Sequence, residues 1–269
     1  MKQFLLPAEY PGQTGEAALP LEVILDSRDT HYLKNVLRCR PGSFFTAADR
    51  SGNLWEAEIS GFKNKNAIVK LLKVLDGAKD GEDNIPEIIL YQCLLKGKKM
   101  DMVVRQATEA GVSAIVPVVS EFSISKIEEK NWQTRIDRWN KICREALQQS
   151  GSRILPEISM PLDLEQAAVK AKNEEKNISL FFHQEPIANK PLHQYLFSAS
   201  EKISIIIGPE GGFSDNETKY LRDSNFLPVW LGRNVLRAET AAIYSIAAVK
   251  TILLERYKWI LTSDSTEKG

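Results

Sequence analysis

Two short loops hold the residues best suited to bind a ligand and to carry out chemistry. The first, GPEGG at 208–212, ends the β-branched apolar run 203–207. The second, LGRNVLR at 231–237, follows another apolar run and leads into a long apolar helix. Glycines let a ligand approach the backbone closely, while Glu210 and Arg237 add a carboxylate and a guanidinium. Because both loops follow buried strands of an α/β sheet, we expect them to border one ligand crevice.

The spacing of the glycines argues against the common phosphate-binding motifs. The three glycines of 208–212 do not fit G-x-G-x-x-G, and no Lys-Ser/Thr pair follows as in a P-loop. Taken alone, this loop could equally be a tight strand-to-helix turn, capped by Ser214 or Asp215 with Glu217 in the first helical turn. It is the pair of loops together that favours a ligand site.

Composition narrows the class of protein. The chain has 269 residues, of which 43% are hydrophobic and 26% charged, so we expect a soluble protein with a sizeable core in two domains or one large one. No apolar run is long enough to span a bilayer, and the N-terminal one is too short for a signal peptide. The formal net charge of +0 gives no support to nucleic-acid binding from bulk charge.

Cysteines and histidines argue against disulfides and metal sites. The 3 cysteines are widely spaced, without a C-x-x-C pair, which favours a reducing, cytoplasmic setting. His31, His183 and His193 are isolated and lack the spacing of metal ligands, so we expect no metal.

The first part of the chain, residues 1–75, reads as a small β-barrel. Turn signals separate short apolar runs such as 21–25 and 67–72, and one helix is expected at about 30–38. Lys34 and Arg38 would lie on the polar side of this helix, either as a solvated face or in contact with phosphates.

Beyond a polar linker at 76–86, the chain alternates strands with helices up to residue 260 and ends in a flexible tail, 261–269. This alternation predicts a parallel sheet covered by helices on both faces. The expected strands are 88–94, 113–118, 154–159, 178–183, 203–207 and 226–231, and the expected helices are 98–110, 129–150, 162–173, 215–224 and 238–258.

The segments IGPEGGFS and LGRNVLRAETA together resemble the cofactor-binding motifs of the SPOUT class of RNA methyltransferases. Within that class, the chain resembles the family that methylates N3 of a uridine in 16S ribosomal RNA. KGKKMD at 96–101, RQATEAGV at 105–112 and QSG at 149–151 also fit, and HYLKNVLRCRPG at 31–42 is similar to the family's amino-terminal PUA-like barrel. The matching pieces cover most of the chain.

The resemblance implies a fold, a cofactor and partners. The fold is an N-terminal PUA-like β-barrel that binds RNA, followed at 87–260 by a SPOUT α/β domain whose parallel sheet forms a deep trefoil knot flanked by helices. The cofactor is S-adenosylmethionine, the substrate is 16S rRNA in the small ribosomal subunit, and the protein is a homodimer with the cofactor site near the interface. The matching cofactor positions are Leu180, His183, Gly208, Glu210, Gly211, Gly212, Leu231, Gly232, Val235, Leu236 and Arg237, and the candidate RNA contacts are Lys34, Arg38, Lys98 and Lys99.

Methylation of uridine N3 requires removal of a weakly acidic proton, and two residues are candidates for catalysis. Arg237 could stabilise the uracil anion or form a salt bridge with Glu210 or Glu239. Glu210 could act as the base or balance the cofactor's positive charge, and water could instead take the proton. His183, at a strand end, is better explained as a structural histidine than as a base.

The chain departs from the family pattern at two positions. Ser152 follows the glycine of QSG where the family has arginine, with Arg153 one residue later, and Asn234 stands where the family tends to have a basic residue.

Other functions also stay open. The chain could be a non-catalytic RNA-binding assembly factor, a SPOUT methyltransferase of another RNA, or an unrelated α/β enzyme with a nucleotide cofactor.

Overall fold

The computed structural model describes residues 3–7, 10, 19–49, 52–76, 85–123 and 131–257. The predicted tail and most of the predicted linker lie outside these residues. The chain forms two compact units. The first consists of Met1–Gly81, Val104–Gly111 and Asp137–Pro156, and the second of Glu82–Val103, Val112–Ile136 and Glu157–Gly269.

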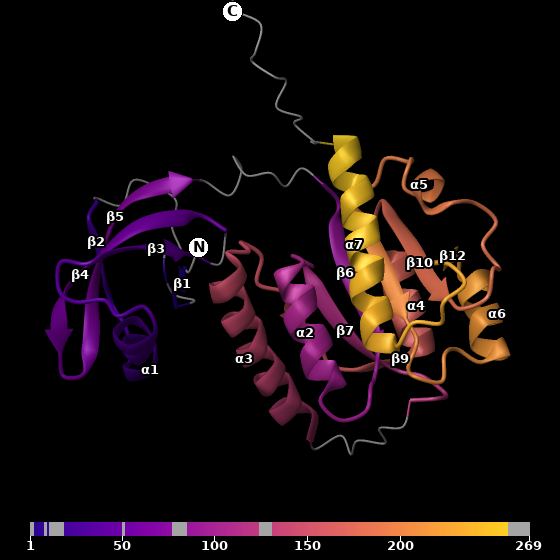
Figure 1. The fold of residues 1–269 in the computed structure, drawn as a ribbon, viewed down its shortest axis with the longest axis horizontal. Coiled ribbons are helices and arrows are strands. Elements are labelled where there is room, and N and C mark those ends of the chain that lie inside the picture. The colour runs from indigo at the N-terminus through magenta and orange to yellow at the C-terminus, as the bar shows by residue number, and fades with distance from the viewer. Residues whose placement is uncertain are drawn as a thin grey trace, which may run out of the picture. The chain divides into compact units, whose positions relative to one another are not determined.

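The first unit contains a five-stranded sheet in the order β1-β3-β4-β5-β2, antiparallel except where β1 pairs with β3 (Figure 1). Alternating apolar residues of these strands meet in one buried core. The strands are β1 (Phe4–Leu5), β2 (Leu21–Ile24), β3 (Phe44–Ala48), β4 (Leu54–Lys63) and β5 (Asn66–Asp76).

The helix of this unit begins earlier than the sequence pattern indicated. Helix α1 (Ser27–His31) starts after Asp26, whose side chain accepts a hydrogen bond from Asp29 N at 2.8 Å, and continues as one π-helical turn, η1 (Tyr32–Val36). The expected start at residue 30 missed this cap because the apolar face appears only one turn later. Arg38 follows with a positive φ of 58° and ends the helix.

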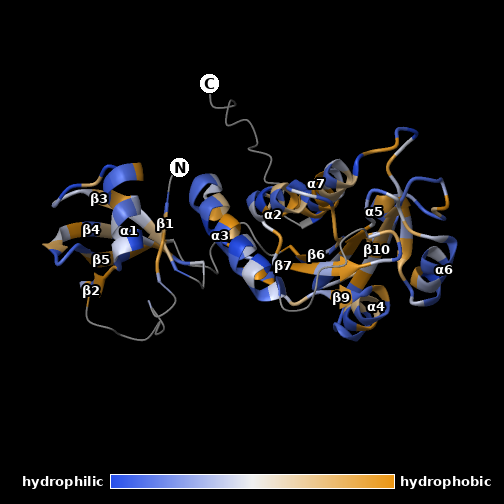
Figure 2. Ribbon diagram, turned by 90° about the horizontal axis from the view of Figure 1, so that it is seen from below, coloured by the Kyte–Doolittle hydropathy of each residue, from blue (hydrophilic) through white to orange (hydrophobic). Residues whose placement is uncertain are grey.

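The second unit contains the predicted parallel sheet, in the order β12-β10-β11-β6-β7-β8. Its strands β7 and β10 are mainly hydrophobic (Figure 2), as expected of strands covered on both faces. The strands are β6 (Glu87–Cys93), β7 (Ala114–Val119), β8 (Glu157–Ile158), β9 (Leu162–Asp163, paired with β7), β10 (Asn177–His183), β11 (Lys202–Ile207) and β12 (Leu227–Trp230).

Helices cover both faces of this sheet. Helix α7 lies on one face, and α4 lies on the other (Figures 1 and 2). One apolar cluster joins Leu164 and Ala168 of α4 and Leu221 of α6 to Phe181 and Ile206 of the strands. The helices of the chain's α/β part are α2 (Lys99–Glu109), α3 (Trp132–Ser150), α4 (Leu164–Asn173), α5 (Leu192–Tyr195), α6 (Asp215–Asp223) and α7 (Ala238–Tyr257).

The fold class predicted from the alternating strands and helices is confirmed. The expected strand 154–159 was too long, because only Glu157 and Ile158 pair with a neighbour, and strand β9 and helix α5 were not predicted. The trefoil knot stays a prediction. Among the described helices, none combines the length and apolarity needed to cross a bilayer.

Candidate functional site

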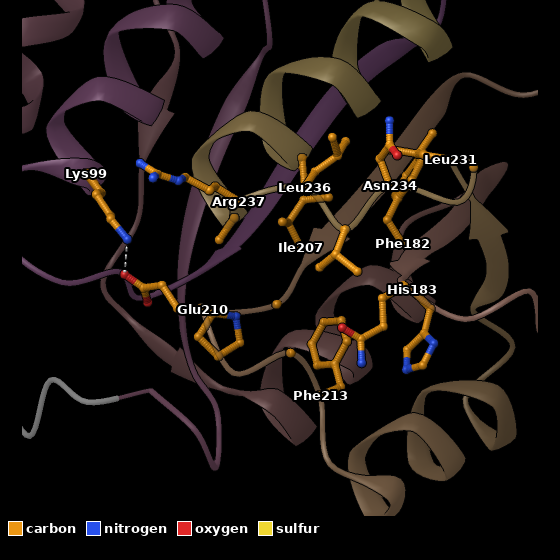
Figure 3. A pocket seen from close by; sticks show the side chains of 18 residues that line it. Lys99, Phe182, His183, Ile207, Glu210, Phe213, Leu231, Asn234, Leu236 and Arg237 are labelled. Atoms are coloured by element: carbon orange, nitrogen blue, oxygen red, sulfur yellow. Dashed lines mark hydrogen bonds and ion pairs between the residues drawn. The ribbon is translucent and has the colours of Figure 1, made fainter.

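A cavity of about 340 Å³ lies at the carboxyl ends of β10, β11 and β12, where both loops meet as predicted (Figure 3). Lys99, Glu210 and Arg237 lie at one end, and Leu231 and Asn234 at the other. The lining residues are Lys99, Phe182, His183, Gln184, Ile207, Gly208, Pro209, Glu210, Gly212, Phe213, Leu231, Gly232, Asn234, Val235, Leu236, Arg237, Ala238 and Ala241.

The GPEGG loop is held in place by the carboxylate of Glu217. Ser214 caps α6 and forms a capping box with Glu217, as the sequence indicated. The second oxygen of Glu217 accepts a hydrogen bond from Glu121 N at 2.8 Å, in the loop after β7. The carboxylate is therefore buried but fully used, and it joins the two loops that follow β7 and β11.

Two glycines are required for different physical reasons. A Cβ at Gly211 would lie 3.0 Å from Phe122 Cβ, so this glycine permits close packing of the GPEGG loop on the loop after β7. Gly232 has a φ of +119°, which a residue with a side chain rarely adopts. Gly211 therefore lets the GPEGG loop pack against Phe122, and Gly232 allows the second loop to turn along the cavity wall.

Apolar side chains form much of the wall. Ile207 ends β11, Phe213 directly follows the GPEGG loop, and Leu236 comes from the second loop (Figure 3). Gly208, Gly212 and Gly232 line the same cavity, so backbone atoms of both loops form part of its wall. Such a surface suits a flat heteroaromatic ring with hydrogen-bonding edges, such as the adenine of a nucleoside cofactor.

The charged end of the cavity is organised around Lys99. Its Nζ donates to Glu210 Oε1 at 2.9 Å, and the same oxygen accepts from Lys96 N at 3.2 Å. Lys99 Nζ also lies 3.7 Å from Glu239 Oε2. In the part of the chain that the structure describes, Arg237 forms no ion pair with either carboxylate. Lys99, and not Arg237, forms the salt bridges to Glu210 and Glu239.

These contacts determine the charge state of Glu210. Partial burial raises its pKa, but hydrogen bonds from Lys99 and from the backbone N–H groups of Glu210 and Lys96, together with the charge of Lys99, outweigh burial and leave the pKa below its usual value. Glu210 therefore stays ionised at neutral pH and is a weak proton acceptor. Its geometry suits attraction of a positive group better than general-base catalysis.

His183 lies on the cavity wall but is engaged locally. Its Nδ1 accepts a hydrogen bond from Glu185 N at 3.1 Å, which occupies the lone pair that a base would need on that nitrogen. This contact fits the structural interpretation of His183.

Not every candidate residue reaches the cavity. Leu180 is completely buried in β10 and belongs to the core, and Lys98 is exposed beside Lys99 without lining the cavity. Lys34 and Arg38 are exposed on the first unit, with Lys34 Nζ 3.9 Å from the centre of the Phe62 ring.

Several lining residues lie outside the predicted cofactor loops, namely Gln184, Ile207, Phe213, Ala238 and Ala241. Most of them directly flank predicted positions. The ends of the strands and the start of α7 were therefore the sequence features that could have indicated these contacts. Asn234 lines the cavity with an uncharged amide. Ser152 accepts a hydrogen bond through its backbone oxygen from Gln3 Nε2 at 2.6 Å, a contact that does not depend on its side chain.

The described residues contain no cluster of three or more His, Cys, Asp or Glu side chains that could hold a metal ion.

Comparison with known proteins assigns both parts of the chain. Residues 82–250 match a family model described as an RNA methyltransferase domain, and residues 25–72 match one described as an RNA methyltransferase PUA domain. The first match alone covers more than half of the chain.

Named relatives and solved structures agree with this assignment. Ribosomal RNA small subunit methyltransferase E 2 of Borreliella burgdorferi is 32% identical over 86% of this chain and 91% of its own length. Ribosomal RNA small subunit methyltransferase E of Synechocystis is 31% identical over 88% and 76%. A methyltransferase E from Neisseria gonorrhoeae, crystallised with S-adenosylmethionine, is 28% identical with a TM-score of 0.79, covering 94% of this chain and 98% of that one. The chain therefore belongs to the RNA methyltransferase family that includes these small-subunit ribosomal RNA enzymes, which confirms the family predicted from its two glycine-containing loops.

Proposed function

We propose that this protein transfers a methyl group from S-adenosylmethionine to N3 of a uridine in the 16S rRNA of the small ribosomal subunit. The observation that carries the proposal is the cavity between the GPEGG and LGRNVLR loops, in a chain of the RNA methyltransferase family. Relatives named for small-subunit rRNA methylation support the substrate, and a structure solved with S-adenosylmethionine supports the cofactor.

The residues present fit this cofactor. The apolar wall formed by Ile207, Phe213 and Leu236 receives the adenine, and the backbone of the two loops satisfies its polar edge. Glu210 is an ionised carboxylate at the charged end of the cavity, where it favours a positively charged ligand group. The cofactor supplies an activated methyl group, so the protein's task is to position the uracil and to stabilise the charge that develops on it.

Arg237 is the residue that we assign to this charge. It lines the cavity without forming an ion pair to Glu210 or Glu239 within the described residues, so its guanidinium can donate to a uracil oxygen. As N3 loses its proton, negative charge spreads to the neighbouring oxygens, and a fixed cation lowers the energy of that state. Glu210 is already engaged by Lys99 and Lys96 N, so in this proposal the N3 proton is released to the solvent and not to a side chain.

Three further properties belong to the same proposal. The domain at 1–75 binds RNA through its barrel, with Lys34 and Arg38 as contacts, and the domain at 87–260 carries catalysis. The protein acts in the cytoplasm on assembled small subunits. It forms a homodimer through the open face of α7, where Tyr244 is 53% exposed while Ala242, Ile246 and Val249 bury the opposite face.

The proposal is tested by methyl transfer from labelled S-adenosylmethionine to undermethylated small subunits. The wild-type protein should yield label in 3-methyluridine after digestion to nucleosides. Arg237→Ala should lose about 100-fold in kcat, as expected for removal of one fixed donor, and Arg237→Lys should recover part of that loss. Binding of S-adenosylhomocysteine, measured by calorimetry, checks that the cavity is intact in each variant.

Each outcome separates one part of the proposal. Label in 3-methyluridine with a fully active Arg237→Ala keeps the function and removes the catalytic assignment. Label in another nucleoside makes the protein a methyltransferase of a different RNA position. Cofactor binding without transfer to any RNA tested contradicts the proposed reaction and favours an assembly factor.

A further inference from the structure

Lys99 occupies a position that its own helix does not favour. It is the first residue of α2, where the helix dipole repels a positive charge. Two carboxylates from elsewhere in the chain hold it there, Glu210 at 2.9 Å and Glu239 at 3.7 Å. Lys99 also lines the cavity beside Arg237 (Figure 3). An ammonium kept in this place by carboxylates of the GPEGG loop and of the first turn of α7 is better explained by a ligand contact than by helix stability.

Glu239 is the more unusual of the two partners. Its residue is only 6% exposed, and its Oε2 has no hydrogen-bond partner among the described residues. A buried carboxylate is costly unless a charge compensates it, and Lys99 is its ion-pair partner in the described structure. Glu239 does not line the cavity, and its ion pair to Lys99 connects its charge to a residue that does.

The uracil anion is better stabilised by two hydrogen-bond donors than by one. N3 lies between two carbonyl groups, and the negative charge left by its proton spreads over both oxygens. A single guanidinium donates hydrogen bonds to only one of these two oxygens. Lys99 and Arg237, side by side at the same end of the cavity, provide a second fixed cation for the other.

We propose that Lys99 is a second catalytic contact to the target uracil, and that Glu239 is the positioning residue that keeps its ammonium in place when the substrate draws it from Glu210. This inference rests on the proposed function. Glu239 supplies a second anionic partner behind the cavity, so Lys99 remains neutralised while one of its N–H groups turns to the ligand.

The charge of Lys99 is consistent with a donor. Its pKa is raised, mainly because Glu210 accepts a hydrogen bond from it, with further contributions from the charges of Glu210 and Glu239. Burial and Arg237 act in the opposite direction. Lys99 therefore remains an ammonium at the pH of the reaction and does not serve as the base.

Kinetics of matched variants tests both roles. Lys99→Met should reduce kcat at least tenfold, while S-adenosylhomocysteine binding changes less than threefold, and Lys99→Arg should restore part of the rate. Glu239→Gln should lower kcat by a similar factor with little change in KM. Lys170→Met and Glu165→Gln, on exposed positions of α4, should behave as wild type.

The double variant Lys99→Met/Glu239→Gln distinguishes positioning from a general loss of structure. If Glu239 acts through Lys99, the double variant is no slower than Lys99→Met alone. Multiplied losses, or a wild-type kcat in either single variant, overturn the proposal. Glu239→Asp serves as the second variant if Glu239→Gln fails to fold, and it should retain more activity than Glu239→Ala.

A titration that does not depend on activity completes the test. Lysine amines are labelled by reductive methylation with ¹³C-formaldehyde, and the Lys99 resonance is identified by its absence in Lys99→Arg. This resonance should titrate at lower pH in Glu239→Gln than in wild type, and an unchanged titration contradicts the coupling. If wild type shows this coupling but makes no 3-methyluridine, the proposed function fails while the ion-pair arrangement stands.

Discussion

At the residue scale, Arg237 and Glu210 line one cavity but differ in what holds them. Glu210 accepts hydrogen bonds from Lys99 and Lys96, whereas Arg237 has no ion pair to the nearby carboxylates within the described residues. Charge alone could not separate these roles, because both residues are ionised at neutral pH. The contacts favour Arg237 as a donor to the substrate and Glu210 as a fixed negative charge.

The Glu210 ion pair predicts a pH-dependent contribution to stability. The folded-state pKa of Glu210 is lowered, so its contribution is present above its unfolded pKa of about 4.3 and is lost as pH falls through the folded value. Glu210→Gln should therefore melt slightly below wild type at pH 7, and this small difference should disappear below about pH 4. Melting curves at pH 3.5, 5 and 7 check this, and a difference that grows in acid contradicts it.

Gly232 predicts a loss of ligand affinity on substitution. Its φ of +119° strains any residue with a Cβ, at a cost of about 1–3 kcal/mol, so Gly232→Ala should bind S-adenosylhomocysteine about tenfold more weakly or worse. Calorimetry measures the change. Gly61→Ala is the matched control, because its Cβ would meet nothing within 4 Å and its φ is ordinary. Equal affinities for wild type and Gly232→Ala would show that this backbone conformation is not required.

At the element scale, the start of α6 depends on one buried carboxylate. Glu217 accepts hydrogen bonds from Ser214 N and Glu121 N, so Glu217→Ala leaves two backbone donors without their partner. We expect a loss of about 1–3 kcal/mol in the free energy of unfolding, measured in urea. Asn216→Ala, in the same turn but exposed, should stay within about 0.5 kcal/mol of wild type.

Helix α7 predicts the oligomeric state. One side of it is buried by Ala242, Ile246, Val249 and Leu253, and Tyr244 stands on the exposed side. If that side is the homodimer interface, Tyr244→Glu should produce monomers at micromolar concentration in sedimentation experiments. Val169→Glu on α4, at a similarly exposed apolar position, should leave the dimer intact. A wild-type protein that is monomeric and active removes the homodimer from the proposal.

At the scale of the whole molecule, burial determines which cysteines react. Burial raises the pKa of Cys93 to about 12 and that of Cys143 to about 11, against smaller opposing hydrogen bonds. Cys39 is only half-buried. Iodoacetamide at pH 8 should therefore modify Cys39 first in the folded protein and all three after unfolding, as mass spectrometry can show. Early modification of Cys93 would contradict the packing of the sheet around it.

Local patterns were sufficient for most of the second unit. Strands β6, β10 and β11 and helices α2, α4, α6 and α7 lie within a few residues of their predicted bounds. Long apolar runs and marked periodicity make such elements visible in the sequence. The two-residue strands β8 and β9 depend on pairing with β7, and the early start of α1 depends on the Asp26 cap, so neither feature stood out in the sequence.

The sequence by itself determined the family, the alternating α/β architecture and the two loops of the cavity, because residue types at short spacing carry that information. Only the tertiary structure decided which charged groups meet. Lys99, Glu210 and Glu239 come from three separate segments, and their distances follow from the packing of α2 and α7 with the loop after β11. It also placed Leu180 in the core and Gly211 against Phe122. These outcomes depend on contacts between distant segments, which local propensity does not encode.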